Sequence, residues 1–250
     1  MKRITVIIAI VILLFQGVGI CSDANLSKAW KYYLKSDYTN TIKLCRSISG
    51  PSKSGQEARY LMGLSFLKLG KPEEARDNFN FLLNNYPNSH MTQELLLAAA
   101  DSFYLDGEFE SAESAYKRLL KNFKNGDYNT FCYLRLGVSL RKQGKWDEAE
   151  RYFYRIVKDY PTSLEISDAK KFLKKDKFFT VQAGAFSKKE NALKFEETLK
   201  RKGYYTSFEK VYDKDNILYK VKTGKFSTKV MADNEVLRLE RDGFSARISS

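Results

Sequence analysis

The sequence predicts an array of α-helical repeats followed by a domain with the element order βαββαβ and a four-stranded antiparallel sheet, a mixture of α and α/β classes. Two internal periodicities indicate this organisation. Between residues 26 and 163 one pattern recurs every 37 residues, as from Gly107 to Gly144. In the last third of the chain a second pattern recurs after 40 residues, so that Val181 is followed by Val221. A repeat of about 20 to 50 residues is typical of helical solenoids. A unit that is duplicated only once indicates a single domain whose core is built from two similar halves.

The composition indicates a folded, basic protein. The 250 residues carry 43 Lys and Arg against 30 Asp and Glu, a formal net charge of +13, which attracts polyanions of several kinds. Three cysteines are too few for a disulfide framework. Cys45 and Cys132 are expected to be small buried residues, with a bridge between them as the alternative. His90 is the only histidine, and no Cys/His cluster accompanies it, so we expect no metal, no cofactor and no histidine-based catalysis.

Residues 1–24 are expected to form an export signal. Two basic residues precede an apolar run from Ile4 to Phe15, which is too short for a membrane-spanning helix. Three fates remain open for this segment: cleavage after Ala24, acylation of Cys21, or retention as an uncleaved anchor. The sequence before Cys21 resembles a bacterial lipobox, although Ile20 is larger than the small residue usual there. Each fate predicts an exported protein of the periplasm or cell envelope, either free or tethered to a membrane.

Each unit of the first array is expected to form two antiparallel helices joined by a tight turn. A glycine such as Gly70 ends the first helix in a left-handed conformation. A small residue such as Gly63 lets the paired helices approach closely, and Ala75 lies where they cross. One unit cannot bury its apolar face alone, so neighbouring units must stack. The equivalent close-approach, turn and crossing positions are Gly63, Ala100 and Gly137; Gly70, Gly107 and Gly144; and Ala75, Ala112 and Ala149.

Residues 25–163 resemble tetratricopeptide (TPR) repeats, in the longer variety found in bacterial envelope proteins of outer-membrane assembly and the Tol–Pal system. The resemblance rests on the glycine and alanine positions above and on the Tyr-Pro-x-Ser sequences that begin at Tyr86 and Tyr160. It implies a groove that binds a protein partner, and no chemistry. Residues 164–176 are expected to form a closing helix and a linker.

Residues 177–250 are expected to form the sheet domain, in the element order of ribonucleoprotein-type and ferredoxin-like folds. Gly203 and Gly243 end two amphipathic helices, and right-handed crossovers place both helices on one face of the sheet. Because side chains alternate along a strand, one set points towards the helices and the other to solvent. The inward set is Val181, Thr206, Phe208, Val221, Ala246 and Ile248. The outward set is Thr180, Gln182, Tyr205, Ser207, Glu209, Lys220, Lys222, Ser245 and Arg247.

The uncovered sheet face carries amide, hydroxyl and ammonium groups together with one ring. These groups suit a long polar ligand, although the solvated face of any antiparallel sheet has a similar composition. The face has no nucleophile–base pair and no paired acids in a cleft, so it does not predict catalysis.

Residues 177–249 resemble the SPOR domain through the sequence from Phe179 to Phe186 and its counterpart from Leu218 to Phe226. The resemblance implies binding of septal peptidoglycan, in particular glycan strands stripped of their stem peptides. It also implies contacts from Gln182, Ala185 and Lys220, where an arginine is usual at the last position. Together with other polar and aromatic residues of the strands, the predicted glycan-binding set is Gln182, Ala185, Tyr205, Ser207, Tyr219, Lys220 and Lys222.

The sequence therefore predicts a non-enzymatic protein of the bacterial cell envelope. Its C-terminal domain is expected to bind denuded septal glycan, while the repeats recruit a protein of cell division or wall remodelling. One alternative is an RNA-recognition-like module, because the element order is shared and the chain is basic. Against it, the strands lack the closely spaced exposed aromatic residues that stack bases. The leading hypothesis therefore includes no nucleic acid as a partner. The other alternative is an accessory or regulator of a cell-wall hydrolase without glycan specificity.

Overall fold

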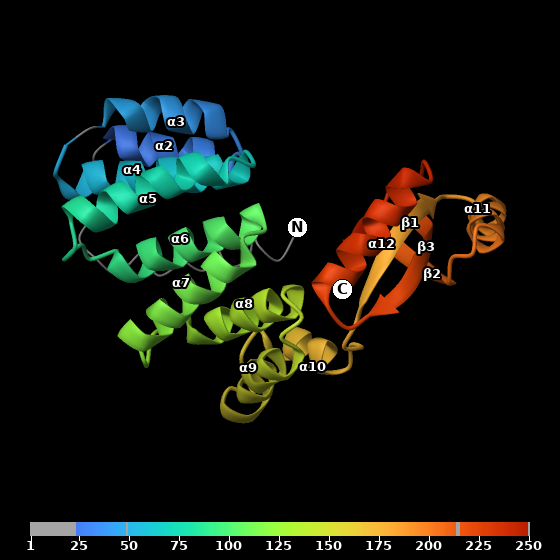
Figure 1. Ribbon diagram of the computed structural model, residues 1–250. Helices are drawn as coiled ribbons and strands as arrows, with labels where there is room; N and C mark the ends of the chain where they lie inside the picture. Colours follow the sequence, from blue (N-terminus) through green and yellow to red (C-terminus); the bar gives the residue numbers. More distant parts are fainter. Residues whose placement is uncertain (1–23, 49, 214–215, 250) are drawn as a thin grey trace. The chain divides into compact units, whose positions relative to one another are not determined.

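The computed structural model describes residues 24–48, 50–213 and 216–249 (Figure 1). By their contacts the residues divide into two compact units, one that ends at Ala99 and one that begins at Ala100, so the boundary falls within helix α6 (Thr92–Asp106). The expected lipidation residue Cys21 and the rest of the expected export signal before Ala24 lie outside the described residues.

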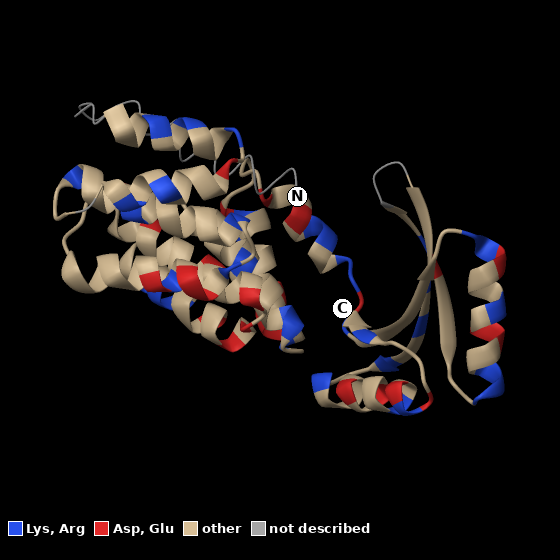
Figure 2. Ribbon diagram, turned by 90° about the horizontal axis from the view of Figure 1, so that it is seen from above, with Lys and Arg blue, Asp and Glu red and all other residues tan. Residues whose placement is uncertain are grey.

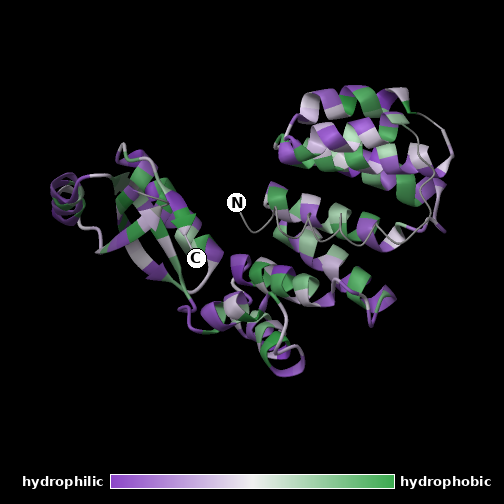
Figure 3. Ribbon diagram, turned by 180° about the vertical axis from the view of Figure 1, so that it is seen from behind, coloured by the Kyte–Doolittle hydropathy of each residue, from purple (hydrophilic) through white to green (hydrophobic). Residues whose placement is uncertain are grey.

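The first unit consists of α-helices, as the 37-residue periodicity predicts. Its core gathers small residues such as Ala58 and Ala75 with large rings and aliphatic side chains such as Phe79 and Leu61, all fully buried. In Figure 3 hydrophobic and hydrophilic residues alternate along these helices, as they do when one stripe of a helix faces a core. The helices are α2 (Ala24–Leu34), α3 (Tyr38–Ser47), α4 (Lys53–Lys68), α5 (Pro72–Asn85) and the beginning of α6.

The second unit begins with further helices of the same kind. Its paired helices are joined by tight turns at Gly107 and Gly144, whose φ angles of 82° and 80° lie in the left-handed region that the sequence predicts for these positions. The closing helix expected after residue 163 is also present. The helices are α7 (Phe109–Asn122), α8 (Asn129–Lys142), α9 (Trp146–Asp159) and α10 (Ile166–Leu173).

The second unit ends with the βαββαβ domain. Its four strands are antiparallel, and their order across the sheet is β2-β3-β1-β4. Both helices pack on the same face, because Ala192 and Leu199 of one helix and Ala232 and Leu239 of the other join a single core with Val221 of the sheet. The elements are β1 (Phe179–Phe186), α11 (Lys189–Arg201), β2 (Thr206–Asp213), β3 (Asn216–Phe226), α12 (Lys229–Arg241) and β4 (Arg247–Ser249).

Within the second unit, the turn between α8 and α9 contacts the start of the sheet domain. The ring centroids of Trp146 and Phe179 lie 4.8 Å apart, and the indole nitrogen of Trp146 donates to the carbonyl oxygen of Ser227 at 3.4 Å. Arg141 donates from Nη2 to the carbonyl oxygen of Asp176 at 2.8 Å. These contacts hold the linker before β1 against the last helical pair.

Cys45 and Cys132 are buried free thiols, as the sequence predicts, and no disulfide joins them. Across the described residues, no group of three or more His, Cys, Asp or Glu side chains is placed to hold a metal ion. The described helices also include none whose length and apolar character would let it cross a membrane.

Candidate functional site

The outward face of the sheet carries a row of polar side chains that crosses all four strands. Gln182 of β1 is paired on one side with Arg247 of β4 and on the other with Lys222 of β3, which in turn is paired with Ser207 of β2. The adjacent Val181 belongs to the core on the helix side, so alternation turns these four side chains to the opposite face. We call Arg247, Gln182, Lys222 and Ser207 the polar row.

A second line of residues lies beside the polar row. Lys220 of β3 is paired with Ala185 of β1 and with Glu209 of β2. Glu209 also forms an ion pair with Lys222 at 2.5 Å, and the side chain of Lys222 is 19% exposed. The carboxylate therefore neutralises one cation of the polar row. Opposite charges on neighbouring strands stabilise the sheet modestly.

Gln182 is less accessible than an open face suggests. It is 9% exposed, as is Thr180 two residues earlier on the same strand. The physical reason is its place on a central strand, between Lys222 and Arg247, whose long aliphatic stems flank it. A ligand on this face meets the two cationic side chains before it reaches the amide.

A β-bulge lies directly after Gln182. The register with β3 shifts between Gln182 and Gly184, which leaves Ala183 as the extra residue. Because of this shift, Gly184 is paired with the inward Val221 and Ala185 with the outward Lys220. The bulge thus brings Ala185 onto the same face as the polar row.

A pocket of about 370 Å³ opens at the end of the sheet where β2 begins and β3 ends. Tyr205 at its rim is 90% exposed, which is rare for a ring of this size. Gly224, with φ of 63°, donates its backbone N–H to the carbonyl oxygen of Tyr205 at 2.9 Å and so holds the rim in place. We call this the end pocket; it is lined by Tyr205, Thr206, Ser207, Gly224 and Lys225. Ser207 belongs both to this pocket and to the polar row.

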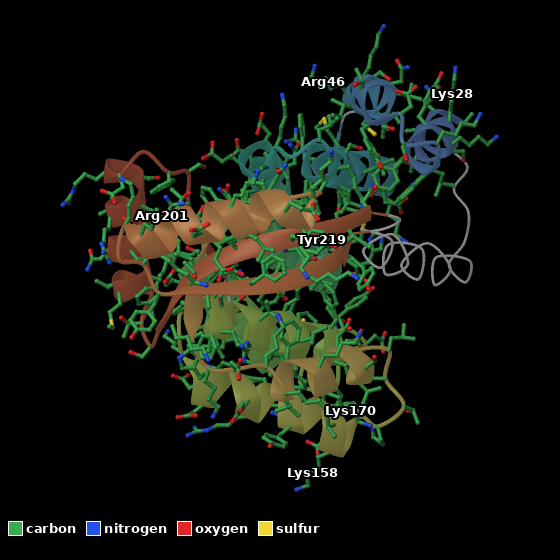
Figure 4. The ribbon with its side chains drawn as sticks, turned by 90° about the vertical axis from the view of Figure 1, so that its right-hand side faces the viewer. Lys28, Arg46, Lys158, Lys170, Arg201 and Tyr219 are labelled. Carbon is green, nitrogen blue, oxygen red and sulfur yellow. The ribbon has the colours of Figure 1, made fainter. Side chains whose placement is uncertain are left out.

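Tyr219 lies on the opposite face of the sheet from the other six expected residues, so the sequence-based placement of its ring on the outward face is wrong. Tyr219, labelled in Figure 4, packs against the core on the helix side, with its ring stacked on Phe208 at a centroid distance of 5.6 Å. Alternation accounts for this, because its neighbour Lys220 points outward. The six that share the outward face are Gln182, Ala185, Tyr205, Ser207, Lys220 and Lys222.

Three residues outside the expected set complete the face. Arg247 is the fourth member of the polar row, Glu209 holds Lys222, and Lys225 lines the end pocket. The alternation of β4 and β2 already placed Arg247 and Glu209 outward, so that pattern contained the signal for both. Lys225 follows the left-handed Gly224, where simple alternation no longer applies.

The repeats carry a separate cluster of polar and aromatic side chains between α6 and α8. The guanidinium carbon of Arg135 lies 4.3 Å from the ring centroid of Tyr104, and its Nε lies 3.9 Å from Asp101. The Tyr116 hydroxyl donates to Asp101. Burial raises the pKa of Asp101, although Arg135 and Tyr116 act in the opposite direction. The cluster joins neighbouring helices, which is a structural role.

Comparison with known proteins agrees with this architecture. Residues 57–89, 94–126 and 131–163 match the model of the tetratricopeptide repeat, and residues 175–248 match the model of the SPOR domain. Both are families of binding modules, and SPOR domains are associated with peptidoglycan and the cell envelope.

Solved structures similar to the chain are TPR-like proteins. A variant of a kinesin light chain from Podosopora anserina, with nearly identical TPR-like repeats, is 9% identical, with a TM-score of 0.50, over 60% of this chain and 90% of that one. MamA of AMB-1 is 15% identical, with a TM-score of 0.46, over 58% of this chain and 76% of that one. At 9% identity the likeness to the kinesin light chain concerns the fold alone. No curated protein matches the chain.

Proposed function

The chain carries tetratricopeptide repeats and a C-terminal SPOR domain, and on this basis we propose a non-enzymatic cell-envelope protein that binds septal glycan strands stripped of their stem peptides. In this proposal residues 1–24 direct export, to the periplasm or a membrane-tethered position. Residues 25–163 recruit a protein partner, residues 164–176 link the two parts, and residues 177–250 bind the glycan.

The observation that carries the proposal is the polar row with the end pocket beside it. A glycan offers hydroxyl and acetamido groups at regular spacing, and these match amide, hydroxyl and ammonium groups set out across strands. In the proposal Gln182, Lys222 and Ser207 form hydrogen bonds to successive sugars, with Lys220 and Ala185 beside them. The ring of Tyr205 stacks on a sugar face at the end pocket.

The sheet disfavours the nucleic-acid alternative. RNA-recognition domains stack bases on exposed aromatic residues of their central strands. In the two central strands here, the outward positions described above hold Gln182, Ala185, Lys220 and Lys222, while Tyr219 packs inward. The strongly exposed rings of the described sheet domain, Tyr205 at 90% and Tyr212 at 70%, lie just before and within edge strand β2, outside the central strands.

A sacculus-binding experiment with the full chain tests the glycan specificity. We expect the protein to sediment with sacculi treated with an amidase, which removes stem peptides, and poorly with untreated sacculi. Tyr205→Ala and Lys220→Ala should each lower the bound fraction, while Lys194→Ala on the surface of α11 should not. Equal sedimentation with both kinds of sacculi would contradict the proposed specificity.

The recruiting role of the repeats needs its own test. In cells, proteins of division and wall remodelling should be compared for septal localisation with the intact chain present and with the chain deleted. We expect at least one of them to lose its septal position when the chain is absent. Unchanged localisation of all of them would contradict recruitment while leaving glycan binding in place.

A further inference from the structure

Lys222 and Lys225 of β3 lie near one end of the outward sheet face, and Lys175 of the preceding linker is close enough to Lys222 for the two charges to repel. Lys222 belongs to the polar row, Lys225 lines the end pocket, and Ser207 lies beside both of them. The Nζ atom of Lys225 lies 4.7 Å from the ring centroid of Phe178, directly before β1. Lys175 lies three residues before Phe178, in the linker that follows α10, and Figure 2 shows this segment rich in basic residues. We call Lys175, Lys222 and Lys225 the lysine cluster.

The cluster holds more positive charge than nearby carboxylates neutralise. Partial burial lowers the pKa of Lys175, and repulsion by Arg141 and Lys222 lowers it further, against attraction by Glu209. In the part of the chain that the structure describes, Glu209 is the carboxylate paired with a member of the cluster, through Lys222. Gathering like charges in this way is unfavourable unless an anion is bound there.

Arg141 adds a buried guanidinium next to the linker. It is 3% exposed, its Nη2 donates to the carbonyl oxygen of Asp176, and its Nη1 has no hydrogen-bond partner among the described residues. Its guanidinium carbon lies 5.2 Å from the ring centroid of Trp146. This arrangement holds the peptide that follows Lys175, so the lysine is carried by an ordered segment.

We propose that the lysine cluster binds a carboxylate carried by the glycan, namely the lactyl carboxylate that appears on a muramic acid residue when its stem peptide is removed. The inference rests on the proposed function, because it names the chemical group that the same face reads. Removal of the stem peptide hydrolyses an amide, so a neutral group becomes an anion on every denuded disaccharide. A cationic cluster beside a stacking ring therefore distinguishes a denuded strand from an intact one.

The geometry suits one sugar pair at a time. In this inference one sugar ring stacks on Tyr205 at the end pocket, which Lys225 also lines. Lys222 is paired with Ser207 across neighbouring strands, which lie about 4.8 Å apart in a sheet. The polar row supplies hydrogen bonds that either form of the glycan can accept, while the lysine cluster responds to the charge alone.

Binding of two chemically matched glycans to the full chain tests the inference. One is denuded glycan with its free lactyl carboxylates, and the other is the same glycan after conversion of those carboxylates to methylamides with a carbodiimide. We expect the native chain to bind the acid form about threefold to tenfold more tightly, the range that two or three exposed charge contacts supply. The preference should fall as salt concentration rises.

The variants separate charge recognition from general weakening. In Lys175→Gln/Lys225→Gln the preference should disappear, so that the acid form binds no more tightly than the methylamide form. Lys194→Gln on α11 changes the net charge in the same direction outside the cluster and should keep the full preference. Circular dichroism checks that each variant is folded. The comparison of the two glycans with the native chain decides by itself whether the protein prefers the acid form.

Each outcome has a defined meaning. Equal binding of both glycans by the native chain overturns the inference and leaves the proposed function standing, whereas binding of neither glycan overturns both. A double variant that loses both glycans equally also overturns the inference. The phosphate groups of a wall polymer also carry negative charge, so poly(glycerol phosphate) is added as a competitor. If it displaces the acid form of the glycan at an equal concentration of anionic groups, the lysine cluster is a phosphate site and the carboxylate site is contradicted.

Discussion

The ring of Phe153 occupies the space that a side chain on Gly137 would need. A β-carbon at Gly137 would lie 2.5 Å from the nearest ring carbon, and the same relationship joins Gly63 to Phe79, where the distance is 2.4 Å. Both rings are fully buried. In both helical pairs, therefore, one aromatic side chain of the second helix lies against the bare backbone of the first.

Gly137→Ala is expected to destabilise the fold although alanine favours helices. The added methyl group would have to displace the ring of Phe153, and overpacking of this kind costs roughly 1–3 kcal/mol. Urea denaturation of the variant measures the loss. Gly137→Ala combined with Phe153→Leu should recover part of the stability, because the smaller side chain leaves room. An increase in stability from Gly137→Ala alone, as at an exposed helical glycine, would contradict this packing.

Gly107→Ala tests backbone conformation without any packing change. No atom lies within 4 Å of the position of the added β-carbon, while φ is 82°. A non-glycine residue in this region costs about 1–2 kcal/mol. We expect the alanine variant to lose stability by that amount and Gly107→Asn to lose less, since asparagine tolerates the left-handed region better. Equal losses in the two variants would show that the backbone angle is not the cause.

Glu113 should make the stability of the second unit depend on pH. Burial acts to raise its pKa, but hydrogen bonds from Lys117, Lys145 and Gln143 outweigh it and hold the pKa at about 2. A carboxyl with a depressed folded-state pKa stabilises the fold above its unfolded pKa, near 4.5, and loses that contribution as pH falls towards 2.

Glu113→Gln should therefore lower the free energy of unfolding at pH 7 by roughly 2–3 kcal/mol. Its difference from the native chain should shrink between pH 5 and pH 2. Glu110→Gln, an exposed change of the same charge on the same helix, is the control and should have little effect at any pH. A Glu113→Gln difference that stays constant over this range would contradict the ionic origin of the stabilisation.

Periodicity predicted the architecture because it reflects local backbone requirements. The left-handed glycines, the close approaches of α4 and α8, and the two-faced sheet all follow from residues spaced along a single helix or strand. The pairing of Gln182 with Lys222 and Arg247 does not, because it depends on strands brought together from distant parts of the chain. The burial of Gln182 was therefore not foreseen.

The misplaced Tyr219 has a different cause. It was included in the expected site as an aromatic residue of a strand, although alternation from Lys220 already predicted an inward ring. Lys175 was missed for the opposite reason: it lies in a linker without periodicity, and its nearness to Lys222 arises only when the linker folds against the sheet. Local patterns thus predicted the faces of the sheet, but not what the linker adds to them.

Two tyrosine substitutions separate the two faces of the sheet. Tyr219→Ala should lower stability by roughly 2 kcal/mol, because the ring packs on Phe208 in the core. Tyr205→Ala should leave stability nearly unchanged, since the ring is 90% exposed, but should weaken binding to denuded glycan. Denaturation and glycan titration on both variants give the comparison. Stable Tyr219→Ala protein with impaired glycan binding would return Tyr219 to the binding face.

Glu209→Gln is expected to strengthen glycan binding. Glu209 forms an ion pair with Lys222 at 2.5 Å, and that contact competes with any anionic or hydrogen-bonding group on the ligand. Removing the carboxylate frees the ammonium group, and a surface ion pair contributes about 0.2–1 kcal/mol, so affinity for denuded glycan should rise about 1.4-fold to fivefold. Glu240→Gln on α12 makes the same charge change away from the outward face and serves as the matched control in a titration with denuded glycan. If both variants gain equally, net charge explains the effect; if Glu209→Gln binds more weakly than the native chain, Glu209 positions Lys222 for the ligand instead of competing with it.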